Sequence, residues 1–274
     1  CPPMCAQKIA KSSAQPRRLP GRREALRELA GGLLAMAALG CRDRAAESAK
    51  RALRVAAAAD LEPAFRALAE LYQQRYGREV VLSFAGSQAL AQQIRHGAPF
   101  DLYAAASVEH IEALLREGRL VPGSLARYAR GALVLWAGPA GALPATVAEL
   151  AQPQYQRIAL ANPEHAPYGL AAVQALRAAG IYDLVARRLV FGENVRQAQQ
   201  FVATGNAEIV LGARALAISS GGSYTVVPQA LYAPLVQALG IVRGGDEGAA
   251  GQFGALLQSA QGQAVLSRFG FAAP

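Results

Sequence analysis

Four segments of the sequence have the residue types and spacing from which proteins build a site for an anion. Asp60, Gly86-Ser87, Ala166-Pro167-Tyr168 and Asn194-Val195 each lie where an apolar run ends and a helical pattern begins. The first turn of a helix carries N–H groups without intrahelical acceptors and about half a positive charge. Such junctions gather at the carboxyl edge of open α/β sheets, so the four together predict an anion site that needs no Lys or Arg.

The acid at the first junction has two interpretations. As an N-cap, the Asp60 carboxylate accepts N–H bonds from its own helix and complements the helix dipole. Alternatively it faces the ligand, repels a fully deprotonated anion and favours an oxyanion that still carries a proton to donate. We favour the capping interpretation, because an unpaired carboxylate that faces a dianion in a dry cleft is costly.

The pattern around these junctions predicts an α/β fold. From Arg54 onward, apolar runs alternate with amphipathic segments, which is typical of helices packed on mainly parallel sheets. The first series of strands is LRVAAAA, VVLSF and DLYAAA, with helices over 61–76, 88–95 and 108–117. The second series starts with GALVLWAG and continues through IALAN, LVFGE, AEIVLGARA, TVVP and LVQALGIV, with helices over 168–179, 195–204, 247–260 and 262–269.

The charge distribution argues against nucleic acid as a partner. The formal net charge is +9, but residues 1–51 hold 11 of the 28 Lys and Arg residues and 4 of the 19 Asp and Glu residues. Residues 52–274 are therefore close to neutral, with 17 basic residues against 15 acidic ones, and no Lys follows Lys50. A basic face that grips phosphates is not expected.

The sequence also lacks the patterns of an enzyme or a metal site. The cysteines, Cys1, Cys5 and Cys41, lie in the N-terminal zone, so the remainder has no disulfide or thiolate metal site. Three histidines occur without metal-ligand spacing, and Ser87 lacks the G-x-S-x-G frame of a nucleophile. No glycine-rich phosphate loop is present. We therefore expect a binding protein without catalytic residues, without a cofactor and without direct cation ligands.

Residues 1–51 are expected to form an export leader and a tether. The segment 21–41 has a basic start, about eleven apolar positions and a small residue before a cysteine, which is too short to span a bilayer. The run from Arg22 to Arg27 resembles a twin-arginine export motif. Ala38-Leu39-Gly40-Cys41 resembles a lipobox, which predicts cleavage before Cys41 and its lipidation, although an ordinary secretory leader is the alternative.

Two longer segments carry a resemblance to a known family. SQALAQQIRHGAPFDLYAAAS, residues 87–107, and NPEHAPYGLAA, residues 162–172, resemble the corresponding segments of periplasmic molybdate-binding proteins, the solute receptors of ABC importers. The likeness runs from Arg54 to Phe271. It implies the two-lobed type II binding-protein fold, each lobe a mainly parallel sheet flanked by helices, with the ligand in a cleft between the lobes.

The resemblance also implies roles for single residues. Ser87 matches a serine whose hydroxyl and N–H bind the oxyanion, Asp60 stands where Ser or Asn is usual, and Tyr168 and Val195 match positions that donate backbone N–H groups. Leu211 stands where many members have a tyrosine that reaches the anion. The expected ligand is molybdate or tungstate; a protonated oxyanion or a small organic anion is the alternative, and an enzyme acting on an anionic metabolite is the more distant one.

The expected organisation follows from this resemblance. Residues 52–130 and 232–274 form the first lobe and 131–231 the second, with hinges near Ala129-Arg130 and Ala230-Leu231. The expected partners are the oxyanion and an ABC permease with its ATPase. We expect a monomer in the periplasm or cell envelope that touches the membrane only through a lipid anchor.

Overall fold

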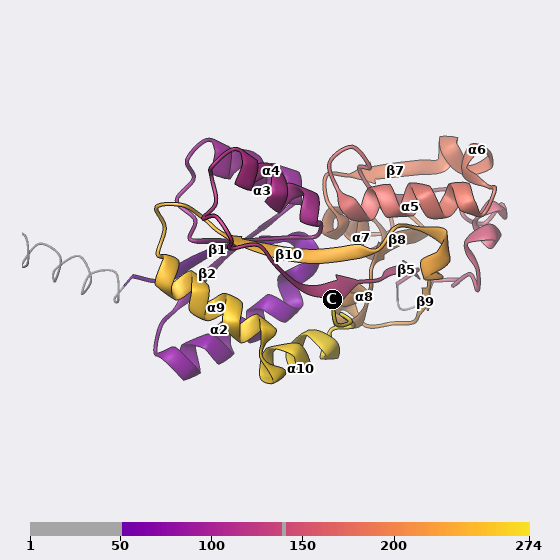
Figure 1. Ribbon diagram of the computed structural model, residues 1–274. Helices are drawn as coiled ribbons and strands as arrows, with labels where there is room; N and C mark the ends of the chain where they lie inside the picture. The colour runs from indigo at the N-terminus through magenta and orange to yellow at the C-terminus, as the bar shows by residue number, and fades with distance from the viewer. Residues whose placement is uncertain (1–50, 139–140) are drawn as a thin grey trace, which may run out of the picture. The chain divides into compact units, whose positions relative to one another are not determined.

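Two five-stranded sheets form the framework of the molecule (Figure 1). The computed structural model describes residues 51–138 and 141–274, which belong to one compact unit, Lys50–Pro274. The predicted export leader, the twin-arginine segment and Cys41 lie outside the described residues. Within the described ranges, no helix is both long and apolar enough to cross a bilayer.

The first sheet has the strand order β2-β1-β3-β10-β4 and the second β7-β6-β8-β5-β9. The strands of the first sheet are β1 (Leu53–Ala58), β2 (Val80–Ala85), β3 (Leu102–Ala105), β4 (Ala126–Gly131) and β10 (Leu235–Ile241). Those of the second are β5 (Leu133–Trp136), β6 (Ile158–Ala161), β7 (Leu189–Gly192), β8 (Ile209–Ala213) and β9 (Tyr224–Val226). Each sheet has both faces covered by helices, as the apolar strand runs require.

Helices α2, α9 and α10 pack on one face of the first sheet and α3 and α4 on the other, while α5 covers one face of the second sheet and α7 and α8 the opposite face. The longer helices are α2 (Glu62–Tyr76), α3 (Ser87–Arg95), α4 (Val108–Arg116), α5 (Pro167–Ala178), α7 (Val195–Ala203), α8 (Arg214–Ser220), α9 (Glu247–Gln258) and α10 (Ala260–Arg268). Short helical segments are η1 (Ala59–Leu61), η2 (Val147–Ala151), α6 (Tyr182–Val185), η3 (Ala186–Arg188) and η4 (Gln229–Leu231).

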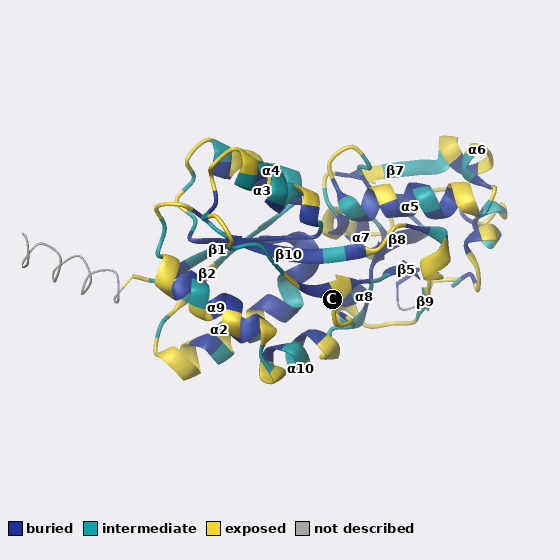
Figure 2. Ribbon diagram, in the orientation of Figure 1, coloured by how far each residue is buried: buried dark blue, intermediate teal, exposed yellow. Residues whose placement is uncertain are grey.

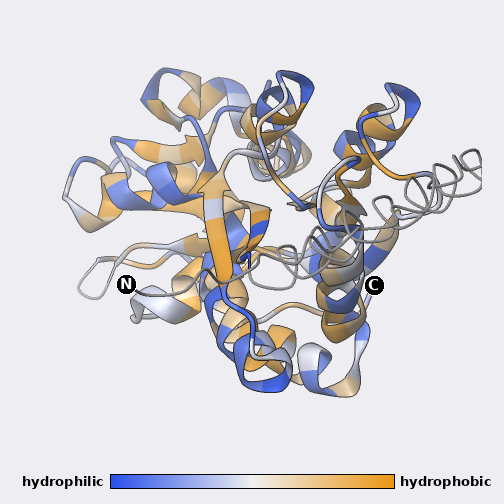
Figure 3. Cartoon of the chain, turned by 90° about the vertical axis from the view of Figure 1, so that its left-hand side faces the viewer, coloured by the Kyte–Doolittle hydropathy of each residue, from blue (hydrophilic) through white to orange (hydrophobic). Residues whose placement is uncertain are grey.

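The apolar strands and inner helix faces form the core. Figure 2 shows buried residues concentrated in the strands and exposed residues on the outer sides of the helices, and Figure 3 shows the same separation in hydropathy. The alanines of β1 are at most 2% exposed to solvent. Because their side chains are small, helices can approach the sheet closely. One core cluster contains residues from both sheets, which ties the two lobes together.

The α/β class and the two-lobed architecture are as predicted, but the sheets are mixed. β10 runs antiparallel to both β3 and β4, and β5 runs antiparallel to β8 and β9. The prediction missed β4, because Arg127 and Arg130 hide the apolar alternation of that edge strand. It also ended the strand around Leu211 too late, because the alanines after Ala213 belong to α8.

The chain crosses between the sheets twice. The first crossing is short, since β4 ends at Gly131 and β5 begins at Leu133. Ala129 and Arg130, where the sequence placed the first hinge, lie inside β4 and pair with β10. The second crossing runs from Val226 to Leu235 and includes η4, in which Ala230 and Leu231 lie.

Candidate anion-binding site

The four predicted junctions meet at one small cavity. The cavity has a volume of about 20 Å³ and is lined by the starts of η1, α3, α5 and α7, together with Ala106 at the end of β3. Asp60, Ser87, Tyr168 and Val195 all line it, so the structure brings together every predicted ligand-binding residue. Two of these helix starts follow strands of the first sheet and two follow strands of the second, so the cavity lies between the lobes.

The helix starts keep their backbone donors free for a ligand. The capping positions of η1, α3 and α5 are Ala58, Gly86 and Ala166, and none of them makes a side-chain cap hydrogen bond. At α7 the Asn194 side chain accepts from the N–H groups of the second and third helical residues, but not from that of Val195. A cavity lined by uncapped helix starts therefore presents N–H groups, which suit an anion.

Ser87 is held so that its hydroxyl proton is available. It is the first residue of α3 rather than its cap, and it is 2% exposed. Its Oγ accepts from the N–H of Ala106 at 3.1 Å, and its carbonyl accepts from the Tyr103 hydroxyl at 2.6 Å. A hydroxyl whose acceptor side is occupied still has one proton to donate. Ser87 therefore fits the predicted role of a ligand donor.

The capping interpretation of Asp60 is wrong. Asp60 lies within η1, whose cap is Ala58, and its side chain makes no cap hydrogen bond to η1 or α2. Its Oδ2 accepts instead from the Nε2 of Gln237 on β10, at 2.7 Å. The carboxyl group is 1% exposed. The η1 turn before α2 points this side chain into the interior rather than back along the helix.

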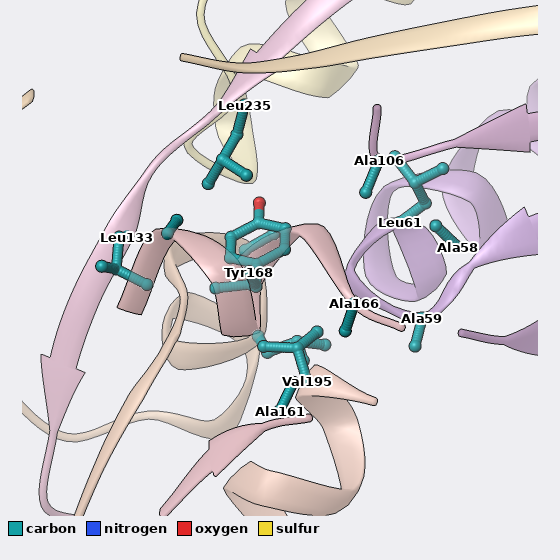
Figure 4. Close-up of a cluster of buried hydrophobic side chains, with 14 of the residues drawn as sticks. Ala58, Ala59, Leu61, Ala106, Leu133, Ala161, Ala166, Tyr168, Val195 and Leu235 are labelled. Atoms are coloured by element: carbon teal, nitrogen blue, oxygen red, sulfur yellow. The ribbon is translucent and has the colours of Figure 1, made fainter. Parts of the chain in front are cut away.

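The Asp60 carboxyl group belongs to a buried polar cluster that joins the two lobes. The hydroxyl of Tyr168 approaches it from α5 without a well-formed hydrogen bond. A Cβ on Gly131 would lie 2.1 Å from that hydroxyl and 3.2 Å from Gln237 Nε2, so only glycine fits beside the cluster. In Figure 4 the hydroxyl of Tyr168 points away from Val195. Tyr168 therefore contributes backbone to the cavity and its side chain to the cluster.

The electrostatics of the cavity are unusual for an anion site. The described residues that line it include no Lys, Arg or His. Burial raises the pKa of Asp60 from 3.8 to about 6, and the nearby Tyr168 and Gln237 only partly oppose this effect. Burial also raises the pKa of Tyr168 well above its usual range. An anion here must be stabilised by neutral donors.

The sequence prediction missed Gln237, and one signal was present. Gln237 is the polar residue inside the apolar run LVQALGIV, and it is fully buried. Buried polar side chains are normally hydrogen-bonded, so its position indicated a polar partner. Leu211, by contrast, is fully buried in β8 and does not line the cavity.

Contacts at the rim join the two lobes. Glu62 Oε2 on α2 pairs with Arg196 Nη1 on α7 at 2.8 Å. A Cβ on Gly86 would lie 3.5 Å from the carbonyl oxygen of Glu193 and 3.6 Å from the Cβ of Asn194, which is ordinary contact. His165 lines two wider pockets that share residues with the cavity, together called the outer cleft, but it does not line the cavity itself. Among the described residues, no group of three His, Cys, Asp or Glu side chains is arranged to hold a metal ion.

Comparisons with known proteins agree with this architecture. Residues 53–272 match the family of bacterial extracellular solute-binding proteins. The chain is 36% identical over 248 residues to the molybdate-binding protein ModA of Azotobacter vinelandii, which covers 89% of this chain and 94% of that protein. It is 33% identical over 212 residues to ModA of Rhodobacter capsulatus, covering 77% and 83% of the two chains.

A solved structure gives the same result. The periplasmic molybdate-binding protein of Azotobacter vinelandii superposes with a TM-score of 0.75 at 32% identity, covering 81% of this chain and 99% of that one. Both the sequence and the fold therefore match over nearly the whole of the described chain. The protein belongs to the ModA family of bacterial extracellular solute-binding proteins, which are binding proteins rather than enzymes.

Proposed function

We propose that this protein captures molybdate outside the cytoplasm and delivers it to an ABC importer. The observation that supports this most strongly is the small cavity of about 20 Å³ at four helix starts, without a basic side chain among its described lining residues. A cavity of this size suits a small tetrahedral anion, and uncapped N–H groups supply the donors it needs. The similarity to molybdate-binding proteins points to the same ligand.

Selection among oxyanions rests on size and on the number of neutral donors. Tungstate has the charge and shape of molybdate and is expected to bind with it, whereas sulfate is smaller and makes longer, weaker contacts in the same cavity. An organic anion would need a wider cavity than this one. One second candidate is a protonated oxyanion, because the cavity contains an acceptor, Asp60, that a fully deprotonated anion does not satisfy.

The two lobes close around the ligand when the protein captures it. The first lobe comprises residues 52–130 and 232–274 and the second 131–231, and the chain passes between them near Gly131 and along the segment around η4. Each crossing is a single segment of the chain, which suits hinge closure around a ligand. Closure covers the anion and creates the surface that the permease and its ATPase recognise. The protein acts as a monomer, exported by way of residues 1–51 and anchored by acylated Cys41.

Thermal unfolding with a panel of anions tests this function. Molybdate, tungstate, sulfate, phosphate and arsenate are added separately at two pH values. A ligand at about a hundred times its dissociation constant adds about 2.7 kcal/mol of stability, which raises the melting temperature by about 5–10 °C. Molybdate and tungstate are expected to give this rise and sulfate much less. A rise with phosphate or arsenate alone identifies the protonated-oxyanion candidate, and no rise with any anion rejects the proposal.

A pair of serine variants tests the site itself. Ser87→Ala removes the hydroxyl donor and should weaken molybdate binding by about ten- to a hundredfold, the usual effect of losing a hydrogen bond to a charged group. Ser107→Ala is the matched control, since Ser107 lies beside Ala106 but does not line the cavity. Isothermal titration calorimetry should show an affinity within about twofold of wild type for the control. Equal losses in both variants would contradict the assignment of Ser87.

A further inference from the structure

The Asp60 carboxyl group is almost fully buried, and no cation among the described residues neutralises it. From α5 and β4 it is faced by the hydroxyls of Tyr168 and Tyr128, and from β10 by the amide of Gln237. Tyr128, like Tyr168, has a buried hydroxyl without a hydrogen-bond partner among the described residues. These groups are all neutral.

The charged residues on the surrounding helices are engaged elsewhere. α2, α7 and α8 also pack against η1. Glu62 on α2 and Arg196 on α7 pair with each other, and Arg214 on α8 donates to the hydroxyl of Tyr224. The histidines nearest to the site, His110 and His165, line the outer cleft and not the cavity. None of these groups offsets a negative charge on Asp60.

If Asp60 is a carboxylate, the hydrogen bonds of the cluster are incomplete. If Asp60 is a carboxylic acid, the cluster gains a further donor. The Nε2 of Gln237 donates to Asp60 Oδ2, but the Oε1 of the same amide has no partner among the described residues. A carboxylate offers only acceptors, whereas a carboxylic acid has an O–H to donate. An acid and a primary amide can pair through two hydrogen bonds, one in each direction. A proton on Asp60 supplies the donor that the Gln237 amide lacks.

A bound dianion makes protonation of Asp60 still more favourable. The anion would lie in the cavity that Asp60 itself lines, with no Lys, Arg or His among the described lining residues. Two negative charges beside a buried carboxylate repel it strongly, and a buried group under such pressure neutralises instead. A proton from solvent is the neutralising species that the site can accept before the lobes close.

We propose that the capture of a tetrahedral dianion is coupled to the uptake of one proton by Asp60, so that the closed, loaded protein holds a neutral carboxylic acid beside the oxyanion. This inference rests on the proposed function. The only bond formed is the O–H bond on an Asp60 oxygen, and the proton comes from water or buffer. Asp60 thereby sets the pH range over which the protein holds its ligand.

The sign of the pH dependence follows from linkage. The loaded protein binds one more proton than the open, empty protein at any pH between the Asp60 pKa values of the two states. Burial alone raises the pKa of Asp60 to about 6 in the closed form, and a neighbouring dianion raises it further. Across that window, molybdate affinity should fall by up to about tenfold for each unit rise in pH.

Calorimetry in buffers of different ionisation enthalpy counts this proton directly. Molybdate is titrated into the wild-type protein at about pH 6 in several buffers, and the slope of the observed enthalpy against buffer ionisation enthalpy gives the protons taken up. The wild type should give a slope of about one proton. Asp60→Asn should give a slope near zero and an affinity that no longer varies with pH. His165→Gln, the matched control in the outer cleft, should keep the wild-type slope.

Infrared difference spectroscopy of the wild type gives a second readout that does not depend on a variant folding. Addition of molybdate should produce the C=O band of one protonated carboxylic acid. Binding without proton uptake, or an unchanged slope in Asp60→Asn, overturns the inference but leaves the proposed function intact. Failure of every oxyanion in the panel to bind the wild type overturns both.

Discussion

The first sheet buries one aspartate at each end, and the two carboxyl groups are held in opposite ways. Asp101, just before β3 at the amino edge, contacts Arg51 at 2.6 Å and Arg54 at 3.1 Å and accepts from the backbone N–H groups of Arg54 and Asp246. Burial would raise its pKa, but these hydrogen bonds lower it below the usual range. Asp60, just after β1 at the carboxyl edge, has one amide donor and a raised pKa.

The difference shows how the molecule separates structural charge from the ligand site. Arginines lie at the amino edge of the sheet, where Asp101 balances them. The carboxyl edge, where four helix starts meet, has no basic side chain among the described residues that line the cavity. An arginine there would bind sulfate, phosphate and carboxylates alike, whereas neutral donors discriminate by geometry.

Removing the charge of Asp101 should produce the largest effect on stability. Asp101→Asn leaves two arginines and a backbone N–H without their carboxylate, and breaking a buried pair in this way costs about 3 kcal/mol of unfolding free energy. We place the value at the lower end of the usual range because the Arg51 and Arg54 side chains are 44% and 26% exposed. Urea unfolding measures the loss. Molybdate affinity should stay within about twofold of wild type, and a large loss of affinity would contradict the separation.

The Asp60→Asn variant of the empty protein should differ in the pH dependence of its stability. With a folded-state pKa of about 6 and an ordinary value of 3.8, Asp60 binds its proton in the folded state and not in the unfolded state between these values. Wild-type stability should therefore fall as pH rises from about 4 to about 6, by roughly 2–3 kcal/mol from this group, and stay constant above.

The stability of the variant should not show that fall. The free energy of unfolding of the wild type minus that of the variant therefore isolates the contribution of Asp60. Asp101 has the opposite effect on the protein. Because its pKa is lowered in the folded state, the stability that it contributes is lost as the pH falls below the ordinary pKa of an aspartate. Urea unfolding of the wild type and of both variants between about pH 3 and about pH 8 would show the two trends. A difference for Asp60→Asn that does not change across this range would contradict the burial of an unpaired carboxyl group.

The sequence predicted the positions of the cavity residues better than their contacts. Apolar runs followed by helix starts are local patterns, so the convergence of Asp60, Ser87, Tyr168 and Val195 follows from the α/β class. The direction of the Asp60 side chain does not, because its partner Gln237 is distant in sequence and lies on a strand whose antiparallel direction was not predicted. Local propensity favoured the cap, and a tertiary hydrogen bond replaced it.

The fold prediction had a similar limit. Strand and helix types were recovered where the period of apolar residues was clear, as in β1 and α2. β4 was missed because an edge strand with arginines shows little hydrophobic alternation. For the same reason, the first hinge was predicted at Ala129-Arg130, which lie inside that strand. Strand direction depends on connections that a single sequence shows only indirectly.

The smallest predicted effect concerns the carboxylate two residues after Asp60. Glu62 accepts from Arg66 on its own helix at 2.8 Å and pairs across the lobes with Arg196, whose side chain is 58% exposed. An exposed pair of this kind contributes about 0.5–1 kcal/mol. Because this pair joins the two lobes, Glu62→Gln should speed molybdate release by about two- to fivefold in a stopped-flow competition with excess tungstate.

The meaning of this result depends on whether the Glu62 charge acts between the lobes or on the ligand. Glu208→Gln is the control, because the Glu208–Arg157 pair lies within one lobe and should leave the release rate unchanged. The effect of Glu62→Gln should shrink at high salt, as expected for a surface ion pair. If instead Glu62→Gln slowed release or abolished binding, the charge at the rim would act on the ligand itself. The neutral cavity would then not be the only determinant of affinity, and the separation between structural charge and ligand site would fail at its border.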